Sequence, residues 1–193
     1  VLAGYLRADA QALQFEYGAQ GKPRLSALEA ADLRFNLSHS RGHALIAVAL
    51  EREVGVDIEC LRREVADEKI AQRFFSPEEI AMLTALPIEE QATAFFRCWS
   101  RKEAYLKARG DGIYYGLHHF TVSLRPEDAP ALLANTRHPD EVSRWSMQSI
   151  EVGPEFAACV AAEGVDWRLV CLDAASLTEA EPAAPSFEPS APA

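Results

Sequence analysis

Three carboxylates and a lysine stand at spacings that could hold a divalent cation and a phosphate. In the segment GVDIE, the two-residue period of a β-strand sends Asp57 and Glu59 to the same face. Like charges side by side are unfavourable without a cation, so this pair suggests a hard, oxygen-preferring ion such as Mg²⁺. A half-exposed strand with two solvated acids is the commoner origin of such a pattern, and these residues alone leave both interpretations open.

A second set of residues with chemical potential recurs every four positions in the segment 95–107, FFRCWSRKEAYLK. Trp99, Glu103 and Lys107 therefore share one face of a predicted helix. Glu103 could be the third ligand of the cation or a base, and Lys107 could meet a phosphate. The alternative is an ion pair between residues four apart on a solvated helix, which stabilises by only a few tenths of a kcal/mol.

Two polar segments upstream could contact an anion. The run 36–42, NLSHSRG, is predicted to form a hydroxyl-rich turn after an apolar strand, where Ser38 and His39 can donate to phosphate oxygens. Lys22, in the turn GKP, could supply a cation. Ordinary structural or solvated residues are the alternative for all three.

The predicted helices carry start and stop signals. Within the helical stretch 66–86, Ser76 followed by proline is a start signal and Glu79 completes a capping box, so the chain re-enters a helix there. The strongest helical pattern covers residues 89–109, and Gly110 is placed to cap its C-terminus.

Strands are predicted on both sides of these helices. Residues 32–59 contain strands joined by a turn and a charged break, and an alternating pattern returns after the long helix in segments 118–124, 144–152, 155–163 and 167–173. The order of strands, helices and strands predicts an α+β fold. A faint internal echo between the two halves hints at two similar α+β units facing each other.

Composition sets further limits. The 193 residues carry a net charge of −10, which argues against a broad nucleic-acid-binding face. The sequence has no apolar run long enough for a membrane helix and no signal-peptide pattern, so we expect no membrane association and a cytoplasmic location. We expect one domain over residues 1–178 and a disordered tail, rich in Ala and Pro, over 179–193.

Taken together and in this order, the segments FNLSHS, GVDIE and WSRKEAYLK resemble the three signature motifs of the 4'-phosphopantetheinyl transferases of the Sfp type. The match covers about residues 18–116, with GKP and FFSPEE as weaker additional motifs. The resemblance implies two pseudo-symmetric halves, each an antiparallel sheet with helices, and an active site in the cleft between them. Two such halves in one chain favour a monomer.

The activity implied by the resemblance is transfer of the 4'-phosphopantetheine arm of coenzyme A to a serine of an acyl or peptidyl carrier protein, with release of 3',5'-ADP. The family's metal ligands would be Asp57, Glu59 and Glu103, binding Mg²⁺ with Mn²⁺ as the alternative. Glu103 would also accept the serine proton. These roles follow from the motifs, position by position.

The same resemblance assigns coenzyme A contacts. Lys107 would contact the pyrophosphate and stabilise the departing phosphate. Lys22, Ser38 and His39 would contact the 3'-phosphoadenosine end, and Lys102 would lie near the site.

Other interpretations stay open at this point. One is a non-catalytic relative that keeps the fold and binds coenzyme A or a carrier protein without turnover. Family members commonly carry a further N-terminal stretch with basic residues, and the short N-terminal half here leaves open whether that stretch was cut away or never existed. Basic and aromatic residues that follow GVDIE are candidate contacts for an acidic carrier protein: Arg62, Arg63, Lys69, Arg73, Phe74 and Phe75.

Overall fold

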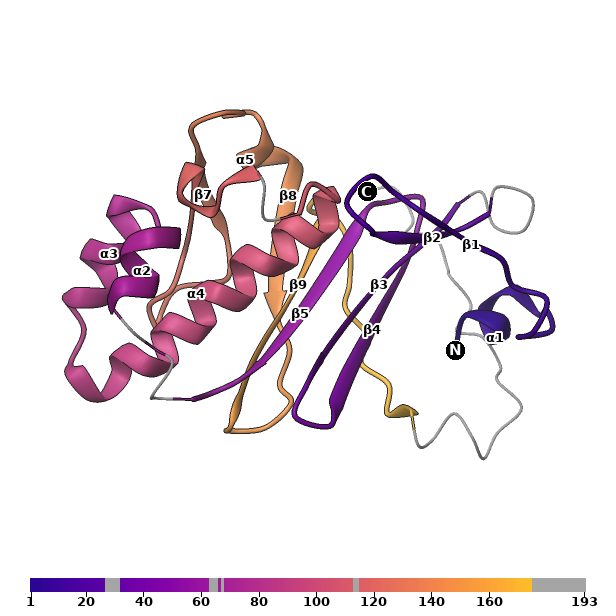
Figure 1. Ribbon diagram of the computed structural model, residues 1–193, viewed down its shortest axis with the longest axis horizontal. Coiled ribbons are helices and arrows are strands. Elements are labelled where there is room, and N and C mark those ends of the chain that lie inside the picture. Colours follow the sequence, from indigo (N-terminus) through magenta and orange to yellow (C-terminus); the bar gives the residue numbers. More distant parts are fainter. Residues whose placement is uncertain (27–31, 63–65, 67, 113–114, 175–193) are drawn as a thin grey trace.

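The computed structural model describes residues 1–26, 32–62, 66, 68–112 and 115–174 and shows a mixed α+β fold (Figure 1). Within these residues, three antiparallel strand pairs accompany one three-stranded sheet in the order β5-β9-β8. The pairs are β1-β2, β3-β4 and β6-β7. The predicted fold class is therefore confirmed at the level of mixed α+β structure.

The elements follow the predicted order of strands, helices and strands. Their bounds in chain order are α1 Leu2–Leu6, β1 Phe15–Tyr17, β2 Pro23–Leu25, β3 Leu33–Ser40, β4 His43–Leu50, β5 Val54–Cys60, α2 Glu68–Phe74, α3 Pro77–Thr84, α4 Ile88–Arg109, η2 Leu117–His119, β6 Phe120–Val122, β7 Leu132–Asn135, α5 Glu141–Arg144, β8 Trp145–Ser149 and β9 Phe156–Glu163.

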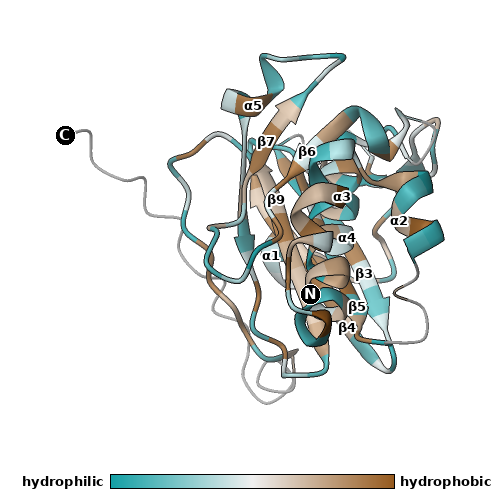
Figure 2. Ribbon diagram, turned by 90° about the vertical axis from the view of Figure 1, so that its left-hand side faces the viewer, coloured by the Kyte–Doolittle hydropathy of each residue, from teal (hydrophilic) through white to brown (hydrophobic). Residues whose placement is uncertain are grey.

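The longest helix, α4, lies against β5 and β9 and runs through the middle of the molecule (Figure 2). Its buried side chains, Tyr105 among them, belong to the largest apolar cluster. Gly55 permits a close approach of helix and strand, because a Cβ at this position would lie 2.2 Å from the carbonyl oxygen of Ala104. The strand that carries Asp57 is thereby held directly against the helix that carries Glu103.

The segment predicted as a polar turn is instead mostly strand. β3 continues through Ser40, and β3 and β4 pair in antiparallel register from Leu33 opposite Leu50 to Ser40 opposite His43. Only Arg41 and Gly42 form the connection, with φ values of 44° and 80°. A two-residue hairpin turn favours positive φ at both positions, so the strands extend to the very tip and carry the predicted turn residues with them.

The helix signals are confirmed. Ser76 caps α3, and its side chain accepts a bond from the Glu79 backbone while the Glu79 side chain accepts one from the Ser76 backbone. This is the reciprocal capping box that the sequence predicted. Gly110 follows α4 in a left-handed conformation with φ 77°.

The C-terminal strands agree with the sequence only in part. β6, β8 and β9 lie in predicted segments, but β7 was missed, and the segment 167–173 contains no strand. Its alternation instead places Trp167 and Leu169 against a small apolar cluster. A period of two can be produced by an extended segment that packs on a sheet without joining its hydrogen-bond ladder.

Two further predictions concern the chain as a whole. None of the helices in the described residues has the length and apolar character needed to cross a membrane. The predicted tail, 179–193, lies outside the described residues.

Candidate functional site

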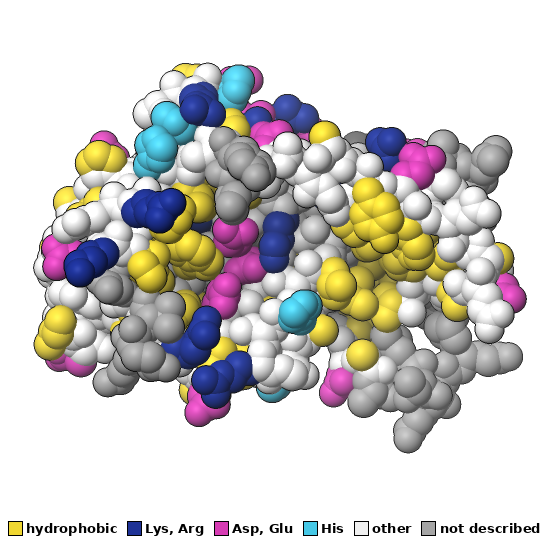
Figure 3. All heavy atoms as spheres, in the orientation of Figure 1, with side chains coloured by type: hydrophobic (Ala, Val, Ile, Leu, Met, Phe, Trp, Pro, Cys, Tyr) yellow, Lys and Arg dark blue, Asp and Glu magenta, His cyan; other side chains and the backbone are white. Residues whose placement is uncertain are grey.

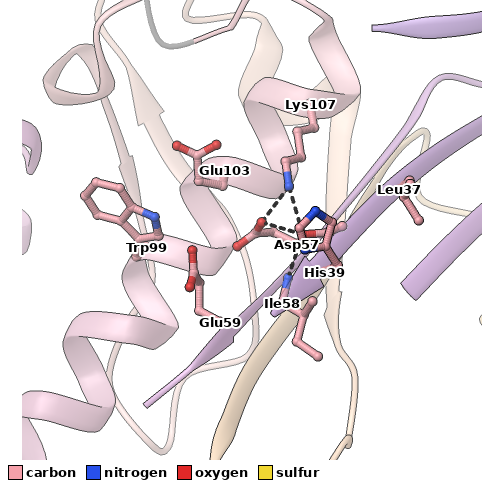
Figure 4. Close-up of a pocket in the computed structure, with 9 residues that line it drawn as sticks. Leu37, His39, Asp57, Ile58, Glu59, Trp99, Glu103 and Lys107 are labelled. Carbon is pink, nitrogen blue, oxygen red and sulfur yellow. Dashed lines mark hydrogen bonds and ion pairs between the residues drawn. The ribbon is translucent and has the colours of Figure 1, made fainter. Parts of the chain in front are cut away.

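A pocket of about 370 Å³ opens where β3, β5 and α4 meet. Figure 3 shows Asp and Glu side chains gathered at the centre of this face with a basic side chain beside them. The pocket is lined by Leu37, Ser38, His39, Asp57, Ile58, Glu59, Trp99, Glu103 and Lys107 (Figure 4). Six of the eight residues to which the motifs assigned a role therefore lie around one cavity.

Strand and helix geometry explains this convergence. β5 presents Asp57 and Glu59 to the pocket, as a two-residue period requires, while α4 presents Trp99, Glu103 and Lys107 at four-residue intervals. The prediction that the three helix residues share one face agrees with their joint position in the pocket wall.

Lys107, Asp57 and Ser38 form the centre of the site. The Nζ of Lys107 lies 2.6 Å from Oδ1 of Asp57 and 2.9 Å from Oγ of Ser38. The Ser38 hydroxyl in turn donates to Oδ1 of Asp57 over 3.0 Å. Asp57 is 3% exposed, whereas the side chain of Lys107 is 29% exposed, so the ammonium can reach a ligand that enters the pocket.

One carboxylate oxygen of Asp57 makes no hydrogen bond among the described residues. This oxygen, Oδ2, is buried. Leaving a buried carboxylate oxygen unpaired is costly, so this atom is suited to a cation or a donor from a ligand. Burial raises the pKa of Asp57, although the ammonium of Lys107 opposes that rise.

The ionised forms of the other two acids, Glu59 and Glu103, are also disfavoured. Burial, and after it the charge of Asp57, raise the pKa of Glu59. Burial, and after it the charge of Asp57, raise the pKa of Glu103 to about 7, despite the opposing charge of Lys107. A positive charge in the pocket would lower the pKa of all three carboxyl groups and favour their ionised forms.

The acids are not arranged as a finished metal cage. Among the described residues, no three carboxylate, imidazole or thiol side chains stand close enough together to hold a metal ion. The Lys107 ammonium occupies the Oδ1 side of Asp57, where a cation would compete with it. Glu59 and Glu103 are both partly exposed in the same pocket wall.

Lys102 does not line the pocket, although it is next to Glu103 in α4. Its side chain is fully buried, and its Nζ lies 2.6 Å from Oε2 of Glu79 and 2.6 Å from the carbonyl oxygen of Phe120. A ligand in the pocket cannot reach an ammonium that is enclosed in this way. The reason is helical geometry, since neighbouring residues on a helix point about 100° apart, so Glu103 and Lys102 face different surroundings.

Lys22 is also held elsewhere. Its Nζ donates to Oε2 of Glu53 over 2.7 Å and to the carbonyl oxygen of Ala108 over 2.8 Å, in the last turn of α4. A lysine in this position satisfies a carbonyl at the helix C-terminus. Lys22 does not line the pocket.

Several contributors were not recognised in the sequence. Leu37 and Ile58 complete the pocket wall, and their only signal was adjacency to the polar motif residues. Gly55 stood within a recognised motif, but its contact with α4 could not be inferred without the helix position. Trp99 was predicted on the same helix face as Glu103 and Lys107, but its contact with Phe74 was not: the two rings pack edge-to-face with centroids 5.6 Å apart, which connects the pocket to α2.

Comparisons with known proteins agree with these motifs. A family model described as the 4'-phosphopantetheinyl transferase superfamily matches residues 53–161. The chain is 40% identical over 169 residues to the 4'-phosphopantetheinyl transferase HetI of Nostoc, covering 87% of this chain and 68% of that protein. It is 30% identical over 167 residues to the 4'-phosphopantetheinyl transferase Sfp of Bacillus subtilis, covering 86% and 70%.

A third relative is covered over a smaller part of its length. The chain is 38% identical to the 4'-phosphopantetheinyl transferase psf-1 of Bacillus pumilus, over 76% of this chain and 59% of that protein. Among solved structures, the holo-[acyl-carrier-protein] synthase of Helicobacter pylori in complex with coenzyme A aligns with a TM-score of 0.42 and 25% identity, over 57% of this chain and 99% of that one.

Proposed function

This chain belongs to the 4'-phosphopantetheinyl transferase superfamily, and we propose that it transfers the phosphopantetheine arm of coenzyme A to a serine of an acyl or peptidyl carrier protein. One observation carries this proposal: Asp57 and Glu59 of β5 meet Glu103 and Lys107 of α4 in one pocket. One buried acid, two partly exposed acids and an ammonium are groups that phosphoryl-type transfer can use.

We propose Asp57, Glu59 and Glu103 as the ligands of Mg²⁺. Two observations support this assignment. A hard cation would coordinate Oδ2 of Asp57, which has no hydrogen-bond partner among the described residues. Its charge would also lower the raised pKa values of the three acids. When bound, Mg²⁺ supplies electrostatic stabilisation to pyrophosphate oxygens. Mn²⁺ accepts the same oxygen ligands and is the alternative.

The remaining roles fall to the chain's own side chains. The carrier serine Oγ attacks the β-phosphate of coenzyme A, a new P–O bond forms, and the P–O bond to 3',5'-ADP breaks. Glu103 accepts the serine proton, directly or through water. Lys107 leaves Asp57 and contacts the oxygens of the departing 3',5'-ADP, to which its partly exposed ammonium can swing.

Coenzyme A is held from the β3 side of the pocket. His39 is exposed at the rim and Ser38 lies at the base, so they are placed to contact the 3'-phosphoadenosine end. The enclosed Lys102 is not part of this proposed site, and Lys22 would have to leave three partners to join it.

The proposed architecture is two pseudo-symmetric halves with the active site in the cleft between them. The pocket supports this proposal, because it takes residues both from the β3-β4 hairpin and from the sheet that contains β5. A single chain that supplies both sides would act as a monomer.

The carrier protein is proposed to dock beside the pocket, on α2 and the residues after β5. Arg62, Lys69 and Arg73 are exposed there, and the half-buried Phe74 touches Trp99 in the pocket wall. Figure 3 shows basic side chains around the acidic centre on this side. Arg63 lies outside the described residues, and Phe75 is buried and unable to contact a partner.

Charge reversal tests this docking surface. Arg62→Glu and Arg73→Glu should raise the KM for carrier protein more than the KM for coenzyme A, because the reversed charges repel an acidic partner. Arg24→Glu, an exposed reversal on β2, is the matched control. Equal effects on both Michaelis constants would exclude this surface as the carrier site.

The activity itself is tested by intact-mass spectrometry of an apo carrier protein incubated with the chain, coenzyme A and Mg²⁺. We expect a mass gain of one phosphopantetheine that disappears with EDTA and with Glu103→Gln. Calorimetry that shows coenzyme A binding without mass gain on any of several carriers would favour the alternative, a non-catalytic binding relative.

A further inference from the structure

The hairpin β3-β4 and the sheet β5-β9-β8 meet along a seam that passes through the pocket. β3 runs beside β5 (Figure 1), yet no main-chain hydrogen bond between the two strands is found in the described residues. β5 is an edge strand of its sheet, and its residues Val56 and Ile58 are almost completely buried. Buried edge amides need acceptors, so the seam must supply them in another way.

Side chains of β3 supply these acceptors. Oδ1 of Asn36 accepts from the amide of Val56 over 2.9 Å, and Oγ of Ser40 accepts from the amide of Cys60 over 3.1 Å. Between them, Oγ of Ser38 accepts from the amide of Ile58 over 3.3 Å. We call these three contacts the seam ladder.

The ladder has a fixed register. Each acceptor lies twenty positions before the residue whose amide it binds, so the strands run parallel and alternate residues of β3 face β5. His39, between two ladder residues, is exposed at the rim of the pocket and is not one of the ladder acceptors. Sliding β3 along β5 by one residue would replace the acceptors with Leu37, which has none, and His39, and would break the present register.

The three ladder residues differ in their relation to the pocket. Ser38 lines it and touches both Lys107 and Asp57, whereas Asn36 and Ser40 do not line it. The two outer contacts bracket the one that the site uses. They fix the strand with the proposed coenzyme A contacts against the strand with the proposed metal ligands.

We propose that Asn36 and Ser40 are positioning residues for coenzyme A binding, acting through the backbone amides of Val56 and Cys60. This inference rests on the proposed function, since it concerns the same pocket. Losing an outer contact loosens β3 against β5 and displaces Ser38 and His39 from the positions that a ligand requires. The acids on β5 and α4 keep their mutual arrangement, because β5 stays paired with β9.

Amide exchange and ligand affinity together test the proposal. In Asn36→Ala and in the milder Ser40→Ala, exchange of the Val56 or Cys60 amide should accelerate. The dissociation constant for coenzyme A should rise about fivefold, because coenzyme A must then restore a strand position that a hydrogen bond of ordinary net strength holds in the wild type. The KM for carrier protein should stay unchanged. Ser40→Thr keeps a hydroxyl acceptor and should restore both readouts.

Ser146→Ala is the matched control, because Ser146 is also a strand serine bonded to backbone, at the carbonyl oxygen of Gly164. It should leave coenzyme A affinity unchanged. Faster exchange with unchanged affinity would show that the ladder is only structural, and unchanged exchange would show that it does not hold the strands; either overturns the proposal. If the wild type binds coenzyme A but modifies no carrier, the proposed function fails while these affinities still decide the inference. Absence of coenzyme A binding by the wild type would overturn both.

Discussion

Helix α4 makes two lysine–carboxylate ion pairs of equal length that have opposite surroundings. Lys107 and Asp57 are 2.6 Å apart at the pocket, and Lys102 and Glu79 are 2.6 Å apart in the core. The core pair is fully buried, whereas the ammonium at the pocket is partly exposed. Pair chemistry alone therefore does not distinguish a structural pair from a functional one.

Hydrogen-bond satisfaction does distinguish them. Oε1 of Glu79 accepts from Lys102 and from the amide of Val122, and Oε2 accepts from the amide of Ser76. Asp57, in contrast, has a buried oxygen that finds no hydrogen-bond partner in the part of the chain that the structure describes. In a closed network, such as that of Glu79, every carboxylate oxygen already has a partner and none is left for a ligand. In an open one, such as that of Asp57, an oxygen can still bind a cation or accept a hydrogen bond.

The largest expected effect is on the closed pair. Lys102→Met should lower the free energy of unfolding by about 3–5 kcal/mol, because Glu79 is then buried without its counter-charge. Denaturant unfolding measures this loss. A loss below about 1 kcal/mol would mean that the core pair is as open to solvent as the pair at the pocket, and the comparison would fail.

The next largest effect is the dependence of stability on pH that Glu103 of the pocket should cause. In the metal-free protein the pKa of Glu103 is about 7 when folded and near 4.5 when unfolded. The folded state therefore holds the proton more tightly, and the resulting stability is complete below about pH 4.5 and lost as the pH rises to about 7. The loss amounts to at most about 3 kcal/mol.

Unfolding at several pH values in EDTA measures this loss, and Glu103→Gln is the control that removes the titrating group. Mg²⁺ at pH 7 should restore stability in the wild type by favouring the ionised acid. An identical pH slope in wild type and Glu103→Gln would contradict the assignment of the raised pKa.

Replacing Lys107 should lower the free energy of unfolding less than replacing Lys102, but it should lower the rate of turnover. Lys107→Met should lower kcat about 100-fold, because the ammonium that meets the departing phosphate is lost. Stability should change less than in Lys102→Met, since the Lys107 ammonium is partly exposed and Oδ1 of Asp57 still accepts a hydrogen bond from Ser38 after its removal. A variant that unfolds as readily as Lys102→Met would show that the pocket pair is structural too.

The sequence predicted which residues meet in the pocket better than it predicted the secondary structure of the segments that carry them. Two-residue and four-residue periods placed Asp57 and Glu59, and then Glu103 and Lys107, on common faces, and these short-range rules need no tertiary information. The same periods could not show that Lys102, one position from Glu103, is enclosed by Glu79 and β6. That outcome depends on how α3 packs against α4.

Long-range contacts account for the other differences. The hydroxyl-rich segment was predicted as a turn because Ser, His and Gly favour turns, yet the face of β3 is needed to satisfy the edge of β5. Asn36 and Ser40 thus gain a role that only the neighbouring strand reveals. Likewise, segment 167–173 alternates like a strand but finds no partner strand among the described residues.

The smallest expected effect tests how much the closed network owes to its capping box. Ser76→Ala removes the acceptor for the Glu79 amide and for the Thr121 hydroxyl, so the free energy of unfolding should fall by about 1 kcal/mol. Ser76→Thr keeps the cap and should behave like the wild type. Transfer activity should be unchanged in both, because this network is separated from the pocket by the body of α4. A raised KM for coenzyme A in Ser76→Ala would show that the two ion pairs are coupled through the helix and are not independent.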